Sequence, residues 1–309
     1  MVFNPTTDIP DQSGKVVLVT GGNAGIGGAT VQLLAAHNPS RIYICARTEK
    51  SATALIDSLS QAHPDVRVIF MPLDLSSLES VKKCAAEFTK DNARLDQLYL
   101  NSGISSTAPA LTKEGYQSQW GINHVGHALL TQLLMPTMLE TAKTVPNADV
   151  RIMVTSSVAH KDAWGKALAL DQVNTADSMG GAISRYGHSK LGNVLFARGL
   201  AQRYPSIIST SYHPGVVKTE IWNKDEGNPW LMAFSRPFVS LFGRSVENGA
   251  YTGLFLATQK GVENGAYYEP IGVLKPGSKF SKDQAEIDKL WGWTDAELKT
   301  HGGPGWPKA

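Results

Sequence analysis

The sequence predicts an α/β fold built on a mostly parallel sheet with helices on both faces. Short runs rich in β-branched residues alternate with longer stretches whose apolar residues recur at a spacing of roughly 3.6 residues. The short runs are apolar along nearly their whole length, as expected of strands that are covered on both faces. Strand–helix–strand units of this size form parallel strands with right-handed crossovers. We therefore predict a doubly wound sheet that binds ligands at the carboxyl ends of its strands.

The first two-thirds of the chain contains the strands and helices of this sheet in alternation. Strands are expected at Val16–Thr20, Ile42–Ala46, Val66–Met71, Leu95–Leu100, Ile152–Ser156 and Ile207–Tyr212. Helices are expected at Ile26–His37, Lys50–Ala62, Leu78–Phe88, Tyr116–Leu139 and Tyr186–Tyr204. Pro136 must bend or interrupt the fourth helix, because proline lacks an amide hydrogen and its ring crowds the preceding turn.

The last third of the chain has a different pattern. Residues 222–243 are rich in aromatic side chains and are broken by prolines. Beyond them, helices are expected at Asn248–Ala257, Lys282–Trp291 and Asp295–Leu298, and residues 301–307 are expected to be irregular. The sequence shows no linker, repeat or low-complexity segment, so we expect residues 1–309 to form a single domain.

Composition narrows the function classes. A chain with 42% apolar and 18% charged residues is typical of a globular protein with a sizeable core. A net charge of +2 is too small to indicate a nucleic-acid partner. The two cysteines have neither the number nor the spacing of a disulfide framework or a metal site, which favours a reducing cytoplasm. No signal peptide and no run of about 18–20 apolar residues is visible, so no transmembrane segment is expected.

A glycine-rich loop, residues 20–27 with the sequence Thr-Gly-Gly-Asn-Ala-Gly-Ile-Gly, follows the first strand and opens the first helix. Glycine accepts positive φ and lets a ligand approach the backbone closely. The amides and the dipole of a helix N-terminus suit a pyrophosphate. A plain turn is the alternative, but the position between strand and helix favours dinucleotide binding.

This loop has the spacing Gly-x-x-x-Gly-x-Gly, which resembles that of the short-chain dehydrogenase/reductase family, and further motifs of that family follow in order. They are Leu73-Asp74-Leu75, Asn101-Ser102-Gly103, Asn123 in an Asn-His-Val-Gly-His run, Thr155-Ser156-Ser157, the Tyr-x-x-x-Lys motif Tyr186–Lys190, and the His-Pro-Gly-Val-Val-Lys-Thr run His213–Thr219. The resemblance covers roughly residues 14–270. Within the family, the runs around Asn123 and Tyr186 look like the retinol-dehydrogenase and WW-domain-oxidoreductase-like branch.

The resemblance implies a single Rossmann-type domain with a mostly parallel seven-stranded sheet and a helical substrate lid. Residues 14–215 would form the cofactor and catalytic core, residues from about 220 to 245 the lid, and residues 281–309 a C-terminal extension. It also implies a homodimer or homotetramer that associates through the helix carrying Tyr186 and its neighbour.

Four residues are expected to carry the chemistry. Tyr186 and Lys190 lie four positions apart, on one face of a helix. A nearby ammonium lowers the pKa of a phenol, so we expect Tyr186 to exchange a proton with a carbonyl or alcohol oxygen. By resemblance, Ser157, the second serine of its pair, hydrogen-bonds the same oxygen, and Asn123 positions a water linked to Lys190. Alone, each of these residues has an ordinary structural explanation, but their joint occurrence favours a catalytic set.

The resemblance also assigns the cofactor contacts. They are Gly21, Asn23, Ala24, Gly25, Ile26, Gly27, Asp74, Leu75, Asn101, Gly103, Tyr186, Lys190, Pro214, Gly215, Val217 and Thr219. After the second strand, Arg47 and Thr48 stand where NAD-preferring folds place a carboxylate. Because a guanidinium pairs with a 2′-phosphate, we expect NADP(H) in preference to NAD(H). Ser102 replaces the second asparagine of the family motif, but Gly103 is retained, so we expect cofactor binding to survive, with any loss in affinity rather than in chemistry.

These features predict an NADP(H)-dependent ketone or aldehyde reductase in specialised metabolism that needs no metal. The aromatic residues of 222–243 suggest an apolar substrate, although they equally suit a flap packed on the core, and membrane or partner contact is a third interpretation. Two alternatives stay open for the whole protein. One is a redox-neutral dehydratase or isomerase on the same fold, and the other is a scaffold that binds NADP(H) without turnover.

Overall fold

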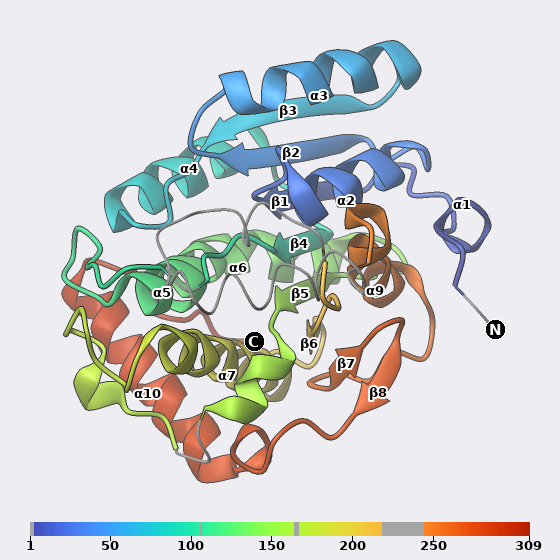
Figure 1. Cartoon of the computed structure of the whole chain (residues 1–309). Coiled ribbons are helices and arrows are strands. Elements are labelled where there is room, and N and C mark those ends of the chain that lie inside the picture. The colour runs from blue at the N-terminus through green and yellow to red at the C-terminus, as the bar shows by residue number, and fades with distance from the viewer. Residues whose placement is uncertain (1–2, 106, 164–166, 218–243) are drawn as a thin grey trace.

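The computed structural model describes residues 3–105, 107–163, 167–217 and 244–309. An eight-stranded sheet in the order β3-β2-β1-β4-β5-β6-β7-β8 runs through this part of the chain (Figure 1). Its strands are β1 Val16–Thr20, β2 Arg41–Ala46, β3 Arg67–Pro72, β4 Gln97–Leu100, β5 Arg151–Thr155, β6 Ile208–Tyr212, β7 Tyr267–Glu269 and β8 Val273–Lys275. The chain adds strands outward from β1 in one direction and then from β4 in the other, so the order reverses between these two strands.

All strand pairs are parallel except the antiparallel pair of β7 and β8. The prediction of seven strands is therefore wrong by one. The additional strand β8 has three residues, all exposed, and β7 has only three residues as well. A segment as short and as exposed as β8 carries no burial periodicity from which a strand could be predicted.

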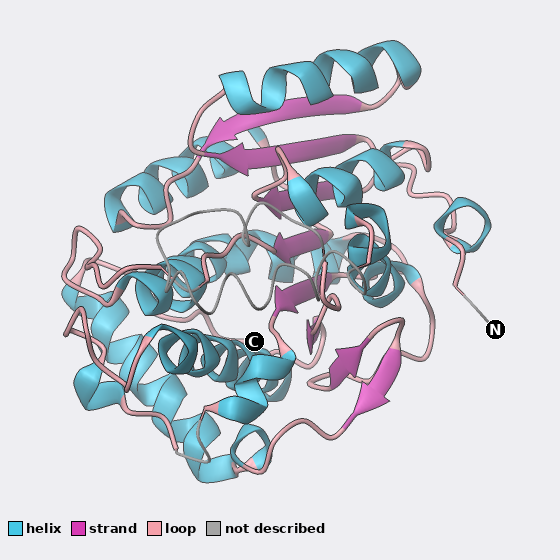
Figure 2. Ribbon diagram, viewed as in Figure 1, coloured by secondary structure: helices cyan, strands magenta, loops and turns pink. Residues whose placement is uncertain are grey.

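Helices cover both faces of the sheet (Figure 2). They are α1 Pro5–Asp8, α2 Gly25–Ala35, α3 Lys50–Ala62, α4 Leu78–Asp91, α5 Ser118–Trp120, α6 Gly126–Thr144, α7 Ala182–Arg203, α9 Val246–Thr258 and α10 Gln284–Thr300, with short helical turns η1 Gly121–Val125, η2 Val158–Asp162, η3 Leu170–Gln172 and η5 Phe280–Lys282. Alternate residues of β1 enter opposite cores: Val16 and Leu18 pack with α4, α6 and α7, whereas Val17 and Val19 pack with α2, α3 and α9. Residues 301–309 form neither helix nor strand.

The long helix predicted at Tyr116–Leu139 is divided, but not at Pro136. A π-helical turn at Gly121–Val125 separates α5 from α6, while α6 continues through Pro136, whose ring is exposed. No side chain fits at position 121 in this turn, because a Cβ at Gly121 would lie 2.3 Å from the Thr112 side chain. Asn123 lies in the middle of the π turn, and such turns occur mostly at functional sites.

One continuous helix, α10, replaces the two short helices predicted near the C-terminus. Trp291 of α10 stacks on Phe196 of α7 with ring centroids 6.2 Å apart, and a Cβ at Gly199 of α7 would lie 2.8 Å from the Trp291 ring. Thr294 lies 3.0 Å from Nε2 of the buried His124 in η1. Packing on both sides of Gly292 therefore keeps the chain helical where the sequence suggested a break.

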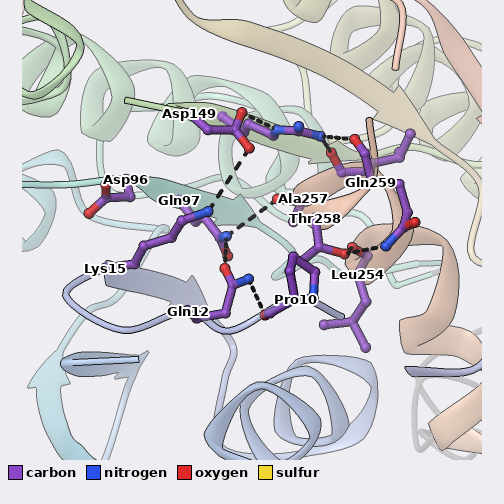
Figure 3. A network of polar contacts seen from close by, with 12 residues as sticks. Pro10, Gln12, Lys15, Asp96, Gln97, Asp149, Leu254, Ala257, Thr258 and Gln259 are labelled. Atoms are coloured by element: carbon purple, nitrogen blue, oxygen red, sulfur yellow. Dashed lines mark hydrogen bonds and ion pairs between the residues drawn. The ribbon is translucent and has the colours of Figure 1, made fainter. Parts of the chain in front are cut away.

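A polar network ties the amino ends of the central strands to the end of α9, at the edge opposite the glycine loop (Figure 3). Arg151 pairs with Asp149 at 2.6 Å and donates to the carbonyl oxygens of Leu256 and Gln259 at 2.7 and 2.8 Å. A cation at the end of a helix satisfies carbonyl groups that lack a partner within the helix. Gln97 bonds Gln12 at 2.9 Å in the same network.

Candidate active site

The glycine loop is shaped by a close approach of its own backbone. Gly21 and Gly25 have φ of +65° and +55°, in the left-handed region that favours glycine. A Cβ at Gly27 would lie 2.2 Å from the carbonyl oxygen of Gly21, so no side chain fits there. The N-terminus of α2 has no side-chain cap, since Ala24 stands at that position. The loop thus leaves the amides of a helix N-terminus open, as a phosphate group requires.

The other predicted cofactor contacts gather at the carboxyl ends of the strands. Arg47 and Thr48 are exposed after β2, and Asp74 after β3 accepts bonds from Ser76 at 2.9 and 2.6 Å. The remaining described ones are Leu75 after β3, Asn101 and Gly103 after β4, and Pro214, Gly215 and Val217 after β6. Thr219 and most of the predicted lid lie outside the described residues.

Thr20 joins the ends of β1 and β4, a role that the sequence analysis missed. Its Oγ1 accepts from the amides of Asn101 and Ser102 at 2.9 and 3.0 Å, and lies 2.9 Å from Nε2 of His127. Nδ1 of His127 lies 3.1 Å from the carbonyl oxygen of Asn123, which only accepts, so Nε2 is the acceptor for the Thr20 hydroxyl. Burial lowers the pKa of His127 to about 4, which keeps the ring neutral. The Asn-His-Val-Gly-His run held a signal for this contact, because His127 follows Asn123 by one helical turn.

Asn123 uses its whole side chain to hold the segment after β4 against α7. Its Nδ2 donates to the Ile104 carbonyl at 3.0 Å and to Ser189 Oγ at 2.9 Å, and its Oδ1 accepts from the Ile104 amide at 2.9 Å. A Cβ at Gly103 would lie 3.1 Å from Asn123 Oδ1 and 3.4 Å from Lys190 Nζ. The side chain therefore fixes the backbone beside Lys190, and the predicted water-positioning role of Asn123 stays a prediction.

Ser157, Tyr186 and Lys190 come together at the carboxyl end of β5. Ser157 follows this strand, and its Oγ accepts from the Ala159 amide at 3.2 Å, which caps η2. The Ser157 hydroxyl also bonds the Tyr186 side chain. Lys190 is 3% exposed, donates to the Thr155 carbonyl at 3.1 Å and lies 5.5 Å from the centroid of the Tyr186 ring. Ser157 is the donor in its bond to Tyr186, because a hydrogen bond that lowers the pKa of a phenol stabilises the phenolate.

The pKa of Tyr186 differs from the sequence-based prediction. Removal from water raises it to about 12, and the Ser157 hydrogen bond opposes this shift. Burial also lowers the pKa of Lys190 to about 8. The expected lowering by Lys190 is absent because the ammonium is directed at Thr155 rather than at the phenol oxygen. The Tyr186 residue is only partly buried as a whole. Even so, desolvation raises its pKa by more than the Ser157 hydrogen bond lowers it.

The described ranges lack two kinds of feature. Within them, no helix combines the length and the apolar character needed to cross a membrane. The same residues hold no group of three or more His, Cys, Asp or Glu side chains arranged for a metal ion. Cys45 and Cys84 are buried free thiols with Sγ atoms 4.0 Å apart.

Comparisons with known proteins identify relatives of this chain. The family model described as short chain dehydrogenase matches residues 15–169. A short-chain dehydrogenase/reductase of Armillaria gallica is 35% identical over 305 residues, covering 95% of this chain and 93% of its own length. Dehydrogenase/reductase SDR family member 13 of Bos taurus is 34% identical over 306 residues, covering 97% of this chain and 77% of its own length.

Solved structures share the fold. A protein from Mycobacterium paratuberculosis has a TM-score of 0.73 at 25% identity, covering 97% of this chain and 98% of its own. The NADPH-bound carbonyl reductase from chicken fatty liver has a TM-score of 0.66 at 22% identity, covering 89% of this chain and 98% of its own. At this level of identity the second likeness concerns the fold alone.

Proposed function

Since this chain belongs to the short-chain dehydrogenase/reductase family, we propose that it transfers a hydride between NADP(H) and the carbonyl or alcohol carbon of a small apolar substrate. The observation that carries the proposal is the convergence of Ser157, Tyr186 and Lys190 at one end of β5. These side chains lie on the same edge of the sheet as the open N-terminus of α2, next to the point where the strand order reverses.

The residues present fit a dinucleotide. The loop closes tightly, since a Cβ at Gly27 would meet the Gly21 backbone, and the uncapped amides of α2 offer donors to a pyrophosphate. Arg47, exposed after β2, is available to a 2′-phosphate, which favours NADP(H) over NAD(H).

When bound, the nicotinamide supplies or accepts the hydride. The residues of this chain transfer the proton. In the reducing direction, Tyr186 donates its phenolic proton to the carbonyl oxygen while Ser157 donates a hydrogen bond to the same oxygen. To stabilise the resulting phenolate, the Lys190 ammonium, which a pKa of about 8 leaves mostly charged near neutral pH, turns from the Thr155 carbonyl toward the phenol oxygen. We propose that the reaction runs toward reduction of a ketone or aldehyde, because NADPH is the reduced form of the proposed cofactor and supplies the hydride.

The first test is a titration with NADPH and with NADH, followed by nicotinamide fluorescence, and then NADPH oxidation with a panel of apolar ketones and aldehydes. The proposal expects NADPH to bind at least about tenfold more tightly than NADH, because a charge-assisted pair is worth roughly 1.5–3 kcal/mol. It also expects turnover with a member of the panel. Binding of neither nucleotide would overturn it. Nucleotide binding with no turnover would favour a scaffold, and conversion of a substrate without NADPH consumption would favour a redox-neutral enzyme. A cytoplasmic location and a homo-oligomer stay predictions.

A further inference from the structure

His160 lies directly behind Ser157 and bonds its backbone. It belongs to η2, and its side chain is 1% exposed. Ring Nδ1 lies 2.6 Å from the Ser157 carbonyl oxygen, and ring Nε2 accepts from the Ser278 amide at 3.1 Å. The ring also meets Tyr267 of β7 edge to face, with centroids 4.6 Å apart.

The two backbone partners determine the protonation state of the ring. The Ser157 carbonyl only accepts, so Nδ1 carries a hydrogen; the Ser278 amide only donates, so Nε2 carries none. His160 is therefore the neutral Nδ1–H tautomer. No other side chain of similar size presents a donor and an acceptor in this arrangement on one rigid ring.

The contacts with His160 hold the Ser157 backbone in place. Its carbonyl accepts twice from His160, from the ring at 2.6 Å and from the backbone amide at 3.1 Å. Its hydroxyl accepts from Ala159. The first turn of η2 thus holds both the backbone and the side chain of Ser157, and its remaining freedom is the direction of the hydroxyl proton.

The other side of the ring rests on a tightly folded segment, residues 276–281. Ser281 Oγ donates to the Ser278 carbonyl at 2.9 Å, and the Ser281 amide donates to Ser278 Oγ at 3.2 Å. Gly277 has a φ of +74°, and a Cβ there would lie 2.5 Å from Ser281 Oγ and 3.4 Å from His160 Nε2. This segment leads into η5 and α10, so His160 joins the C-terminal extension to the end of β5.

We propose that His160 is a positioning residue for Ser157: its ring fixes the Ser157 backbone against the segment 276–281 so that the Ser157 hydroxyl meets the oxygen that Tyr186 protonates. The kinetic part rests on the proposed oxidoreductase function. Displacement of a catalytic group by about 1 Å can reduce a rate by about a hundredfold, so loss of the ring contact to Ser157 should lower kcat.

Three variants separate the two contacts. His160→Asn places an amide nitrogen near the Nδ1 position and retains the donor to Ser157. His160→Gln reaches Ser278 but offers no donor at the Nδ1 position, and His160→Phe keeps the packing on Tyr267 without either bond. His63→Asn, at the end of α3, is the control for an unrelated histidine.

We expect His160→Gln and His160→Phe to lower kcat about tenfold or more, with KM and the NADPH dissociation constant changed less than about twofold. His160→Asn should recover most of the rate. Equal loss in all three variants, or loss accompanied by weaker NADPH binding and a lower Tm in proportion, would reduce His160 to a general structural role and overturn the proposal. Unchanged kcat in His160→Phe would overturn it as well.

A second measurement does not depend on turnover. The ¹H–¹⁵N couplings of the His160 ring, assigned by comparison with His160→Gln, should report the neutral Nδ1–H tautomer at pH 7. An Nε2–H tautomer or an imidazolium would contradict the contacts on which the proposal stands. If no carbonyl substrate is reduced but the tautomer is as expected, the oxidoreductase proposal fails while the Ser157–His160 contact holds.

Discussion

Nζ of Lys190 lies 5.5 Å from the centroid of the Tyr186 ring, one turn further along α7. The two groups respond to burial in opposite directions, since burial disfavours the charged form of each: the pKa of the phenol rises to about 12 and that of the amine falls to about 8. Burial therefore opposes ionisation of both side chains.

Replacing the phenol of Tyr186 should stop proton transfer while sparing the fold. Tyr186→Phe is expected to lower kcat by about 10²–10⁴, because general acid catalysis contributes about that much. Nucleotide affinity should remain. Steady-state kinetics beside an NADPH fluorescence titration test this. Tyr251→Phe, which removes a hydroxyl bonded to Glu247 on α9, is the control and should keep its activity. Full activity in Tyr186→Phe would remove this residue from the mechanism.

The lowered pKa of Lys190 predicts how stability changes with pH. Between its folded value of about 8 and the usual 10.5, the unfolded state binds more protons, so the free energy of unfolding should rise with pH through this window. Tyr186 has the opposite sign: its folded pKa lies above the usual 10.0, so stability should fall from pH 10 to about 12. Urea unfolding of the protein and of Lys190→Met, at several pH values from 7 to 10, measures the first effect. Equal slopes in both proteins would contradict it.

The glycine loop offers a matched pair of substitutions. Gly27→Ala should weaken NADPH binding more than tenfold and destabilise the fold by about 1–3 kcal/mol, because its Cβ would lie 2.2 Å from backbone. Gly28→Ala, one position later, would make only ordinary contact at 3.5 Å and should bind nucleotide normally. Calorimetry and thermal unfolding of both variants separate the two outcomes. Equal behaviour would show that the loop relaxes around the added methyl group.

Charge reversal after β2 tests the cofactor preference. Arg47→Glu should lose affinity for NADPH by about tenfold or more while NADH binding is kept or improved, since a carboxylate repels the 2′-phosphate and accepts from ribose hydroxyls. Arg67→Glu is the control. Arg67 is exposed at the amino end of β3, away from the carboxyl ends of the strands where Arg47 lies, and the variant has the same change of charge. An equal decrease in both variants would point to long-range charge instead of a contact with Arg47.

The Thr20 hydroxyl should be important for stability. Thr20→Val removes the acceptor of two backbone amides and the donor to His127, and is expected to destabilise the protein by about 3 kcal/mol. Thr30→Val is the control, because the Thr30 hydroxyl bonds only to the Ile26 carbonyl within α2. Denaturant unfolding measures both. A loss in Thr20→Val no larger than in Thr30→Val would show that these amides find other partners.

Elements with strong burial patterns could be predicted from the sequence. The predicted bounds of β1 and α3 agree with the structure at both ends. The β8 strand could not be predicted, because three exposed residues pair only with their neighbour β7. The π-helical turn at Gly121–Val125 has room only for glycine at position 121 beside Thr112, and α10 is held along its length by Trp291, which packs on α7. These are contacts between separate segments of the chain, so they cannot be predicted from the local spacing of apolar residues.

The candidate site divides in the same way. Family motifs identified Ser157, Tyr186 and Lys190, which the structure brings together. The same motifs did not indicate the roles of Thr20 and His160, which depend on the backbone groups that face them, although the Asn-His-Val-Gly-His run contains His127. The direction of the Tyr186 pKa shift was also predicted incorrectly, because spacing along a helix says nothing of desolvation or of where an ammonium is directed.

The position of α10 bears on how copies of this protein can associate. Family resemblance places subunit pairing on the helix that carries Tyr186, yet here Trp291 already covers Phe196 and Gly199 on that helix. Tyr204, just after α7, donates to the Pro307 carbonyl at 2.7 Å, so the C-terminal tail extends the same cover. A second copy approaching from this side would meet α10, and any dimer would have to displace it or use another surface.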